Sequence, residues 1–235
     1  MSTPFAAART RIKICGLTRE QDVDAAVAAG ADAIGFVLYG PSPRCISPER
    51  ARVLAGRLPP FVTPVLLFVN EVASKIIATC EEIPGALVQF HGEELAADCD
   101  RVGRPYIRAA RIPHGAAAAG FDLVKYAAQY PNAQAILLDA HVEGYGGGGK
   151  AFDWSLLPPS VDAHLVLSGG LNAANVSDGI AQLRPRCKTL AVDVSSGVEI
   201  AKGIKSAEKI NRFVAAVRAA DQQLAGATHV PVSAA

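Results

Sequence analysis

Two residues of this 235-residue chain, Cys15 and Asp139, carry side chains suited to moving protons. Cys15 ends the alternating segment 12–15, and Asp139 follows the apolar run 135–138. Both segments have the pattern of short β-strands, and α/β proteins keep reactive groups where strands end. A thiol with a pKa of about 8.5 is a reasonable base, and a carboxyl group with a raised pKa can donate a proton. The pair suggests general acid–base catalysis at one rim of a sheet.

Each of the two residues also has a plainer explanation. A lone cysteine is most often a small buried side chain, and an aspartate after a strand often caps a turn or a helix. Lys13 lies on the same strand face as Cys15, because successive side chains alternate. Its ammonium would favour the Cys15 thiolate, but a buried lysine needs a partner. We expect Lys13 to pair with Asp193 on the last predicted strand, in a structural role.

Two loops rich in serine and glycine follow the last two predicted strands. They are residues 168–170, with the sequence SGG, and residues 195–197, with the sequence SSG. In (β/α)8 barrels the loops at these strands commonly hold a phosphate group through backbone N–H groups and a helix N-terminus. One glycine pair alone would only indicate a turn. Two such loops at this place favour a phosphate site.

Arg44 and His91 are further polar candidates. Arg44 stands on a loop stiffened by Pro41 and Pro43, and its planar guanidinium suits a ligand carboxylate. An exposed arginine on a loop more often has no such role. His91 ends another predicted strand with Gln89 on the same face, and no second histidine lies at metal-ligand spacing. We expect His91 to be a hydrogen-bonded scaffold residue.

Eight strand-and-helix units position these residues. The strands are apolar throughout, which indicates a parallel sheet covered by helices on both faces. Eight units in this length match a single (β/α)8 TIM barrel. The alternative, a doubly wound open sheet, carries its glycine fingerprint in the first turn, whereas here the glycine-rich turns come late. The predicted strands are 12–15, 33–38, 64–69, 86–90, 105–109, 135–138, 164–167 and 189–194. The predicted helices are 22–30, one capped by Ser47, 71–82, 93–101, 116–130, 154–157, one capped by Asn172 and ending at 183, and 207–220.

Composition narrows the possible functions. The formal net charge is +1, and lysines and arginines do not interleave with aromatic residues, which argues against nucleic-acid binding. Five scattered cysteines without a CxxC pair argue against a disulfide framework or a structural zinc site. No apolar run approaches the roughly 18 residues of a membrane span. We expect a cytoplasmic protein with one domain at 11–221, an N-terminal extension at 1–10 and a flexible tail at 222–235.

Eight motifs follow one another along the chain: KICGLT, GFVLYGPSPRCISPE, FVNE, VQFHG, LLDA, GGGGKAFDWSLL, LSGGLNAANV and VDVSSGVE. Their order resembles phosphoribosylanthranilate isomerase of tryptophan biosynthesis, from about Lys13 to Val217. KICGLT together with VDVSSGVE is the most specific combination. The resemblance implies a (β/α)8 barrel that isomerises N-(5-phosphoribosyl)anthranilate to 1-(2-carboxyphenylamino)-1-deoxyribulose 5-phosphate by an Amadori rearrangement, without cofactor or metal.

The resemblance also implies roles for single residues. Cys15 matches the general base of the family, and Asp139 matches the general acid. Arg44 falls on the position that holds the anthranilate carboxylate. The residues implied in binding the ribose phosphate are Gly169, Gly170, Ser195, Ser196 and Gly197. Two positions depart from the pattern, since Gly148 stands where Ser or Thr is frequent and Cys45 where an aromatic residue is usual. We expect altered affinity or loop mobility from them, not lost chemistry.

Two other functions stay open at this point. The related isomerase of histidine biosynthesis resembles this chain in its phosphate loops but carries an aspartate where Cys15 stands. A non-catalytic phosphate-binding barrel would not need both proton-transfer positions filled. In every case we expect a small phosphorylated ligand, no nucleic-acid or membrane partner, and a monomer or homodimer.

Overall fold

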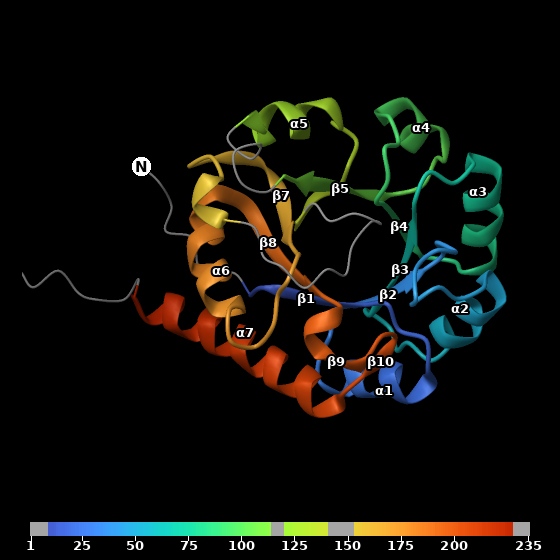
Figure 1. The fold of residues 1–235 in the computed structure, drawn as a ribbon, viewed down its shortest axis with the longest axis horizontal. Helices are drawn as coiled ribbons and strands as arrows, with labels where there is room; N and C mark the ends of the chain where they lie inside the picture. The colour runs from blue at the N-terminus through green and yellow to red at the C-terminus, as the bar shows by residue number, and fades with distance from the viewer. Residues whose placement is uncertain (1–8, 114–119, 141–152, 228–235) are drawn as a thin grey trace, which may run out of the picture.

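Eight parallel strands close into a barrel in the computed structural model, which describes residues 9–113, 120–140 and 153–227. Neighbouring strands pair in chain order, and β8 pairs with β1 to complete the ring. Helices surround the strands (Figure 1), so the predicted (β/α)8 barrel is confirmed. The strands are β1 (Arg11–Cys15), β2 (Ala33–Val37), β3 (Thr63–Phe68), β4 (Leu87–Phe90), β5 (Tyr106–Ile112), β6 (Ala135–Ala140), β7 (Val161–Leu167) and β8 (Cys187–Val194).

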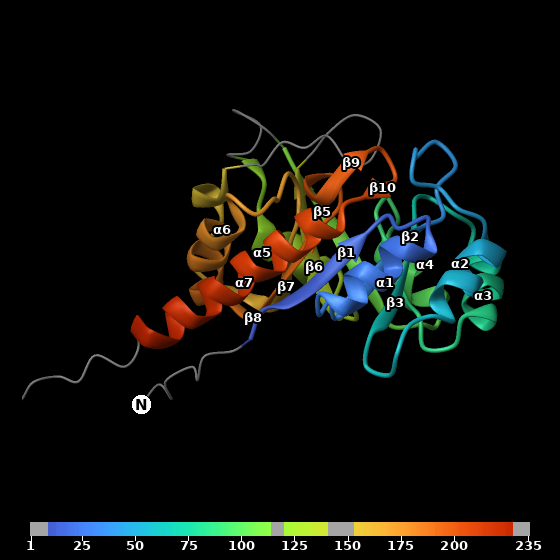
Figure 2. The ribbon, with the colours of Figure 1, turned by 90° about the horizontal axis from the view of Figure 1, so that it is seen from below.

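The outer ring is made of helices and short turns. The α-helices are α1 (Glu20–Ala28), α2 (Pro48–Ala55), α3 (Ala73–Glu82), α4 (Ala96–Arg101), α5 (Leu123–Gln129), α6 (Val176–Leu183) and α7 (Ala207–Ala227). The 3-10 turns are η2 (Trp154–Leu156), η3 (Arg184–Arg186) and η4 (Ser196–Val198). After β8 the chain forms an antiparallel hairpin of β9 (Glu199–Ala201) and β10 (Ile204–Lys205). Both views place this hairpin beside α1 and β2 (Figures 1 and 2).

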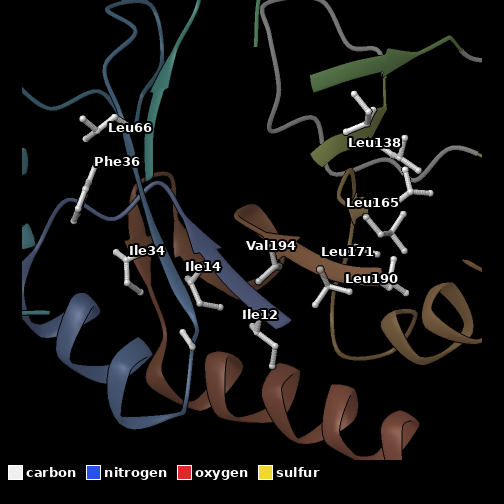
Figure 3. Close-up of a cluster of buried hydrophobic side chains, with 14 of the residues drawn as sticks. Ile12, Ile14, Ile34, Phe36, Leu66, Leu138, Leu165, Leu171, Leu190 and Val194 are labelled. Atoms are coloured by element: carbon white, nitrogen blue, oxygen red, sulfur yellow. The ribbon is translucent and has the colours of Figure 1, made fainter. Parts of the chain in front are cut away.

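Strand alternation separates an apolar outer layer from the interior of the barrel. Ile12 and Ile14 are fully buried between β1 and the surrounding helices (Figure 3). Lys13 and Cys15 therefore face the opposite way, into the barrel, as the period of two requires. The same rule applies on each strand, so the last inward residues of all eight strands meet at one mouth.

Local signals in the sequence set several helix ends. The Ser47 side chain accepts a hydrogen bond from the backbone N–H of Arg50, and Pro48 follows as the first helical residue, which is the predicted cap of α2. Gly30 lies just beyond α1 with a φ of 91°, where a residue without a Cβ is favoured. The predicted Ser47 cap is confirmed, whereas α1 runs from Glu20 to Ala28 and thus starts and ends two residues before the predicted range 22–30.

β5 is longer than the sequence pattern suggested. It ends at Ile112 instead of Ala109, because its pairing with β6 continues as far as Ile112 and Ala140. The extension adds Arg111 to the strand. Alternation then turns the Arg111 side chain to the same face as Ala109, which lies in the barrel interior.

Four helices start later than predicted. α3 begins at Ala73 instead of residue 71, and α4 begins at Ala96 instead of residue 93. α5 begins at Leu123, because the Asp122 side chain caps it by accepting a backbone N–H of the first turn. The predicted helical residues 116–119 lie outside the described part of the chain. α6 begins at Val176, since Asn172 uses its side chain to stabilise a turn that precedes the helix.

The two ends of the chain are more firmly attached than predicted. Thr10, assigned to an extension, is fully buried and donates through its backbone N and its Oγ1 to Asp221, at 2.9 and 2.6 Å. α7 continues to Ala227, beyond the predicted start of a flexible tail at residue 222, because Leu224 packs against the core. The remainder of both predicted segments lies outside the described residues.

Candidate active site

The mouth at the carboxyl ends of the strands brings the two predicted proton-transfer residues together. Cys15 is the last residue of β1, and Asp139 is the next-to-last residue of β6. Asp139 is thus inside its strand and not after it, because β6 stays paired with β5 one residue further. Leu137 lies in an interior cluster of the barrel, and Asp139, two residues on, shares its face. Cys15 keeps 5% of its surface exposed and Asp139 keeps 7%.

An ion pair lies below the Cys15 thiol. Lys13 Nζ donates to Asp193 Oδ1 at 2.8 Å, and Ser168 Oγ donates to Asp193 Oδ2 at 3.2 Å. The predicted Lys13–Asp193 pair is confirmed. Burial alone would lower the pKa of Lys13, but the Asp193 carboxylate outweighs it and raises that pKa above its ordinary value.

The Cys15 thiol is not pre-ionised by Lys13. Burial raises the pKa of Cys15, and the Lys13 ammonium opposes this shift without cancelling it. The expectation that Lys13 would favour the thiolate is therefore only partly met, because burial of the thiol outweighs the attraction of Lys13 and the Asp193 carboxylate adds a smaller effect in the same direction as burial. Room for the sulfur comes from Gly35 on β2, where an added Cβ would lie 2.7 Å from Cys15 Sγ.

Asp139 is held by His91, the residue directly after β4, and His91 is in turn hydrogen-bonded to Gln89 on β4. His91 Nε2 lies 3.0 Å from Asp139 Oδ2, and Gln89 Nε2 lies 3.0 Å from His91 Nδ1. His91 is thus hydrogen-bonded, as predicted, but its contact with Asp139 was missed. The signal was the two-residue spacing of Gln89 and His91, which puts both side chains on one strand face. The contact itself joins β4 to β6, and no local pattern reveals it.

Arg111 is a second residue that the sequence pattern missed. It stands level with Asp139 in the pairing of β5 with β6. Its NH1 donates to Glu93 Oε1 at 3.0 Å. Because the predicted strand stopped at Ala109, the alternation that would have turned Arg111 inward was not extended to it.

The two predicted phosphate loops touch one another. A Cβ on Gly197 would lie 2.0 Å from the carbonyl oxygen of Leu171, so only glycine lets the loop after β8 approach the loop after β7. Gly169 and Gly170 have φ angles of 77° and 66°, which glycine adopts without strain. η4 begins at Ser196, directly after Ser195. Both loops thus lie at the mouth, on the strands that separate β6 from β1.

Arg44 is buried at the mouth, contrary to the expectation of an exposed loop residue. Its Nε and NH2 both donate to Glu199, each at 2.7 Å. A Cβ on Gly16 would lie 2.5 Å from Arg44 Cδ, so the arginine crosses the turn directly after Cys15. Arg44 NH1 makes no hydrogen bond within the described residues and is the nitrogen left for a ligand.

Glu199 and Lys205 extend this ion pair along the hairpin. Lys205 Nζ donates to Glu199 Oε1 at 2.8 Å and to the carbonyl oxygen of Ser195 at 3.1 Å. Burial works to raise the pKa of Glu199, but hydrogen bonds from Arg44 and Lys205 prevail and hold it below its ordinary value. Burial lowers the pKa of Lys205, against the attraction of Glu199. The hairpin thus ties the arginine to a phosphate loop.

No group of three or more His, Cys, Asp or Glu side chains in the described part of the chain is arranged to hold a metal ion. The groups that the mouth offers to a ligand are the thiol of Cys15, the carboxyl group of Asp139, NH1 of Arg44 and the backbone amides of the two glycine-rich loops. This set can exchange protons and hold two anionic groups.

Comparisons with known proteins identify the family of the chain. The family model for N-(5'phosphoribosyl)anthranilate (PRA) isomerase matches residues 12–216. The N-(5'-phosphoribosyl)anthranilate isomerase of Methylibium petroleiphilum is 62% identical over 217 residues, which cover 92% of this chain and 98% of the relative. A phosphoribosyl anthranilate isomerase solved in complex with reduced 1-(o-carboxyphenylamino)-1-deoxyribulose 5-phosphate has a TM-score of 0.72 and 36% identity, covering 89% of this chain and 99% of that one. A structure of monomers made from the dimeric isomerase of Thermotoga maritima has the same TM-score, identity and coverage.

Proposed function

The chain belongs to the N-(5'-phosphoribosyl)anthranilate isomerase family, and from this premise we propose that it isomerises N-(5'-phosphoribosyl)anthranilate in tryptophan biosynthesis. One observation carries the proposal. Cys15 on β1 and Asp139 on β6 share one mouth, and the strands between them, β7 and β8, end in the two glycine-rich loops. A phosphate group held by those loops places its ribose between the thiol and the carboxyl group.

The reaction is an Amadori rearrangement, in which proton transfers first open the ribose ring and then convert the Schiff base to a ketone. Asp139 donates a proton to the ribose ring oxygen, and the ring opens to a Schiff base. The thiolate of Cys15 then removes the proton on C2, which gives an enolamine. Tautomerisation to the ketone adds a proton at C1 and releases one from the oxygen on C2. The proton count is therefore balanced over one turnover, and both residues can recover their starting states.

The two ends of the substrate carry charge, and each has a matching group at the mouth. The phosphate meets the backbone amides of Gly169, Gly170, Ser196 and Gly197, with Ser195 beside them. The anthranilate carboxylate meets NH1 of Arg44, whose other nitrogens are held by Glu199. Anchoring both ends orients the ribose, so that binding far from the reacting carbon lowers the barrier. The thiol distinguishes this chemistry from that of the histidine-pathway isomerase, which uses an aspartate at this place.

Substitution of the acid and the base tests the proposal. Cys15→Ala and Asp139→Asn are each expected to lower kcat by about 100-fold or more, the usual contribution of a general acid or base. The fluorescence decrease of phosphoribosylanthranilate reports turnover. Cys80→Ala, which removes a buried thiol from α3, should keep normal kcat. Near-normal turnover in the Cys15 or Asp139 variant would remove the assigned role of that residue.

The proposal includes a homodimer, in line with the dimeric isomerase of Thermotoga maritima. Phe61 is fully exposed in the loop before β3, with a left-handed φ of 72°, and it borders a pocket of about 740 Å³ lined mainly by apolar side chains, four of them proline. A fully exposed phenylalanine beside an apolar hollow suits a contact between two copies of the chain. Phe61→Asp is expected to shift the protein from dimer to monomer in light scattering after size exclusion. A wild-type protein that elutes as a monomer would contradict this part of the proposal.

The proposal also places the protein in the cytoplasm. All five cysteines lie in the described residues, and none forms a disulfide, as is usual in a reducing compartment. Among those residues, no helix combines the length and the apolar character needed to cross a membrane.

A further inference from the structure

The two carboxyl oxygens of Asp139 have different surroundings. Oδ2 lies 3.0 Å from His91 Nε2. Oδ1 makes no hydrogen bond among the described residues, and a Cβ on Gly169 would lie only 2.9 Å from it. The absent side chain of Gly169 therefore keeps space free at Oδ1, on the side of the phosphate loop. His91 thus holds Oδ2, and Oδ1 is the oxygen that can transfer a proton to a ligand.

Gln89 decides which nitrogen of His91 carries the proton. Gln89 Nε2 lies 3.0 Å from His91 Nδ1, while Gln89 Oε1 is buried without a hydrogen-bond partner in the described residues. Rotating the amide would instead leave the NH2 group unpaired, and an unsatisfied buried N–H is rarer than an unsatisfied carbonyl. The amide N–H thus donates to Nδ1. His91 must then carry its proton on Nε2 and donate it to Asp139 Oδ2.

We propose that His91 and Gln89 are positioning residues that keep the transferable proton of Asp139 on Oδ1. A proton on Oδ2 would face the N–H of His91, so the protonated acid carries its proton on the oxygen that faces the open side. After that proton moves to the substrate, the same N–H stabilises the carboxylate that remains. The proton of His91 does not move in this scheme. The inference rests on the proposed function, in which Asp139 is the general acid.

Among the described residues, the other charged groups near Asp139 are paired elsewhere. From β5, Arg111 stands level with Asp139 and donates to Glu93. From the β7 side, the described residues nearest to Asp139 are the neutral Ser168 and Gly169, and across the mouth Lys13 pairs with Asp193. Within the described residues, His91 is the side chain that hydrogen-bonds to Asp139.

Two substitutions of His91 separate the donated hydrogen bond from simple packing. His91→Gln keeps an N–H donor near the position of Nε2, whereas His91→Met fills similar volume without a donor. We expect kcat to fall about 10- to 100-fold in His91→Met and to stay within about fivefold of wild type in His91→Gln. KM should change by less than about twofold in both variants, because neither removes an anchor of the substrate. His164→Gln, which changes an exposed histidine in the middle of β7, is the matched control.

Nitrogen-15 NMR of the histidine rings tests the tautomer directly. The signals of His91 are those missing from the spectrum of His91→Gln, and we expect the proton on Nε2. In Gln89→Leu the fixed donor is lost, so a mixture of tautomers and a kcat reduced by up to tenfold are expected.

The outcomes distinguish this inference from the proposed function. An active wild type with an inactive Asp139→Asn and a normal His91→Met would overturn the positioning role alone. A proton found on Nδ1 of His91, or a His91→Gln variant as slow as His91→Met, would also overturn it. A wild type that does not turn over phosphoribosylanthranilate would overturn the function and the inference together.

Discussion

Cys15 is the residue whose surroundings most directly shape the reaction. Its thiol lies close to the buried ion pair of Lys13 and Asp193. Burial raises the pKa of the thiol above the ordinary value, although the Lys13 ammonium acts to lower it. A base must be deprotonated to act, so only the thiolate fraction of the enzyme is ready for C2 at neutral pH. The raised pKa also makes the thiolate that does form a stronger base towards the proton on C2.

This environment predicts how activity responds to pH. Since the pKa of Cys15 is raised, the thiolate fraction keeps growing as pH rises past the ordinary thiol pKa of about 8.5. We expect kcat/KM to increase with pH over the range from about 7 to 9, with the increase absent in Cys15→Ala. Initial rates in buffers of constant ionic strength measure it. A plateau already reached below pH 7 would show that the thiol ionises more easily than its burial allows.

Residue types at strand ends could be predicted from sequence because they follow a local rule. Cys15 closes an alternating strand, and the glycines of both phosphate loops mark sharp turns, so position and type together pointed to the mouth. The bond from His91 to Asp139 could not be predicted in this way, because β5 lies between their strands and no periodicity links them. The ion pair of Arg44 with Glu199 could not be predicted either, because no periodicity links residues 155 positions apart.

At the scale of elements, the hairpin of β9 and β10 has the largest effect on the site. Its first strand supplies Glu199 and its second supplies Lys205, and together they hold Arg44 and the carbonyl of Ser195. The hairpin is too short to have been predicted from periodicity, since β9 spans three residues and β10 two. The helix starts at Asp122 and Asn175 were also missed by a few residues. The alanine run 116–119 favours an earlier helix start than Asp122, and Asn172 offers a capping side chain three residues before Asn175.

The hairpin makes stability depend on acidity. The folded pKa of Glu199 lies below its ordinary value, so its stabilising effect is complete above the unfolded pKa of about 4.3 and is lost as pH falls through the folded value. Glu199→Gln is therefore expected to reduce the free energy of unfolding at pH 7 by about 3 to 5 kcal/mol and to flatten its decline in acid. Urea denaturation at several pH values measures both effects.

A matched control for this prediction lies on α7. Glu208 forms an exposed ion pair with Arg212, and its side chain retains 71% of its surface. Glu208→Gln should change stability by less than about 1 kcal/mol. Equal effects of the two substitutions would mean that the buried carboxylate contributes no more than a surface one.

At the scale of the whole molecule, Asp221 links the last helix to the start of the first strand. Its carboxylate on α7 accepts hydrogen bonds from the backbone and side chain of Thr10 and from Arg184 and Arg218. The start of the first strand is thereby fixed to the last helix. The closed barrel itself was predictable from eight repeated units, but this connection joins residues 211 positions apart, beyond the reach of any local pattern.

Loss of this carboxylate should weaken the whole fold. Asp221→Ala leaves the buried backbone N–H of Thr10 without its acceptor, and we expect a loss of about 2 to 4 kcal/mol. In a domain of this size, Tm should fall by roughly 5 to 15 °C in calorimetry. Asp162→Ala removes an aspartate whose side chain is 91% exposed and should leave Tm within about 2 °C. An unchanged Tm in Asp221→Ala would mean that the chain ends close without it.

The pairing of β1 with both β2 and β8 has a consequence for synthesis of the chain. Translation adds about 5 to 20 residues per second, so the roughly 180 residues from the first strand to the eighth emerge over about 10 to 40 s. Throughout that interval β1 has one edge with no partner, and the nascent polypeptide carries an open template for other strands. A chain whose synthesis stalls before β8 would therefore expose the unpaired edge of β1, which favours aggregation.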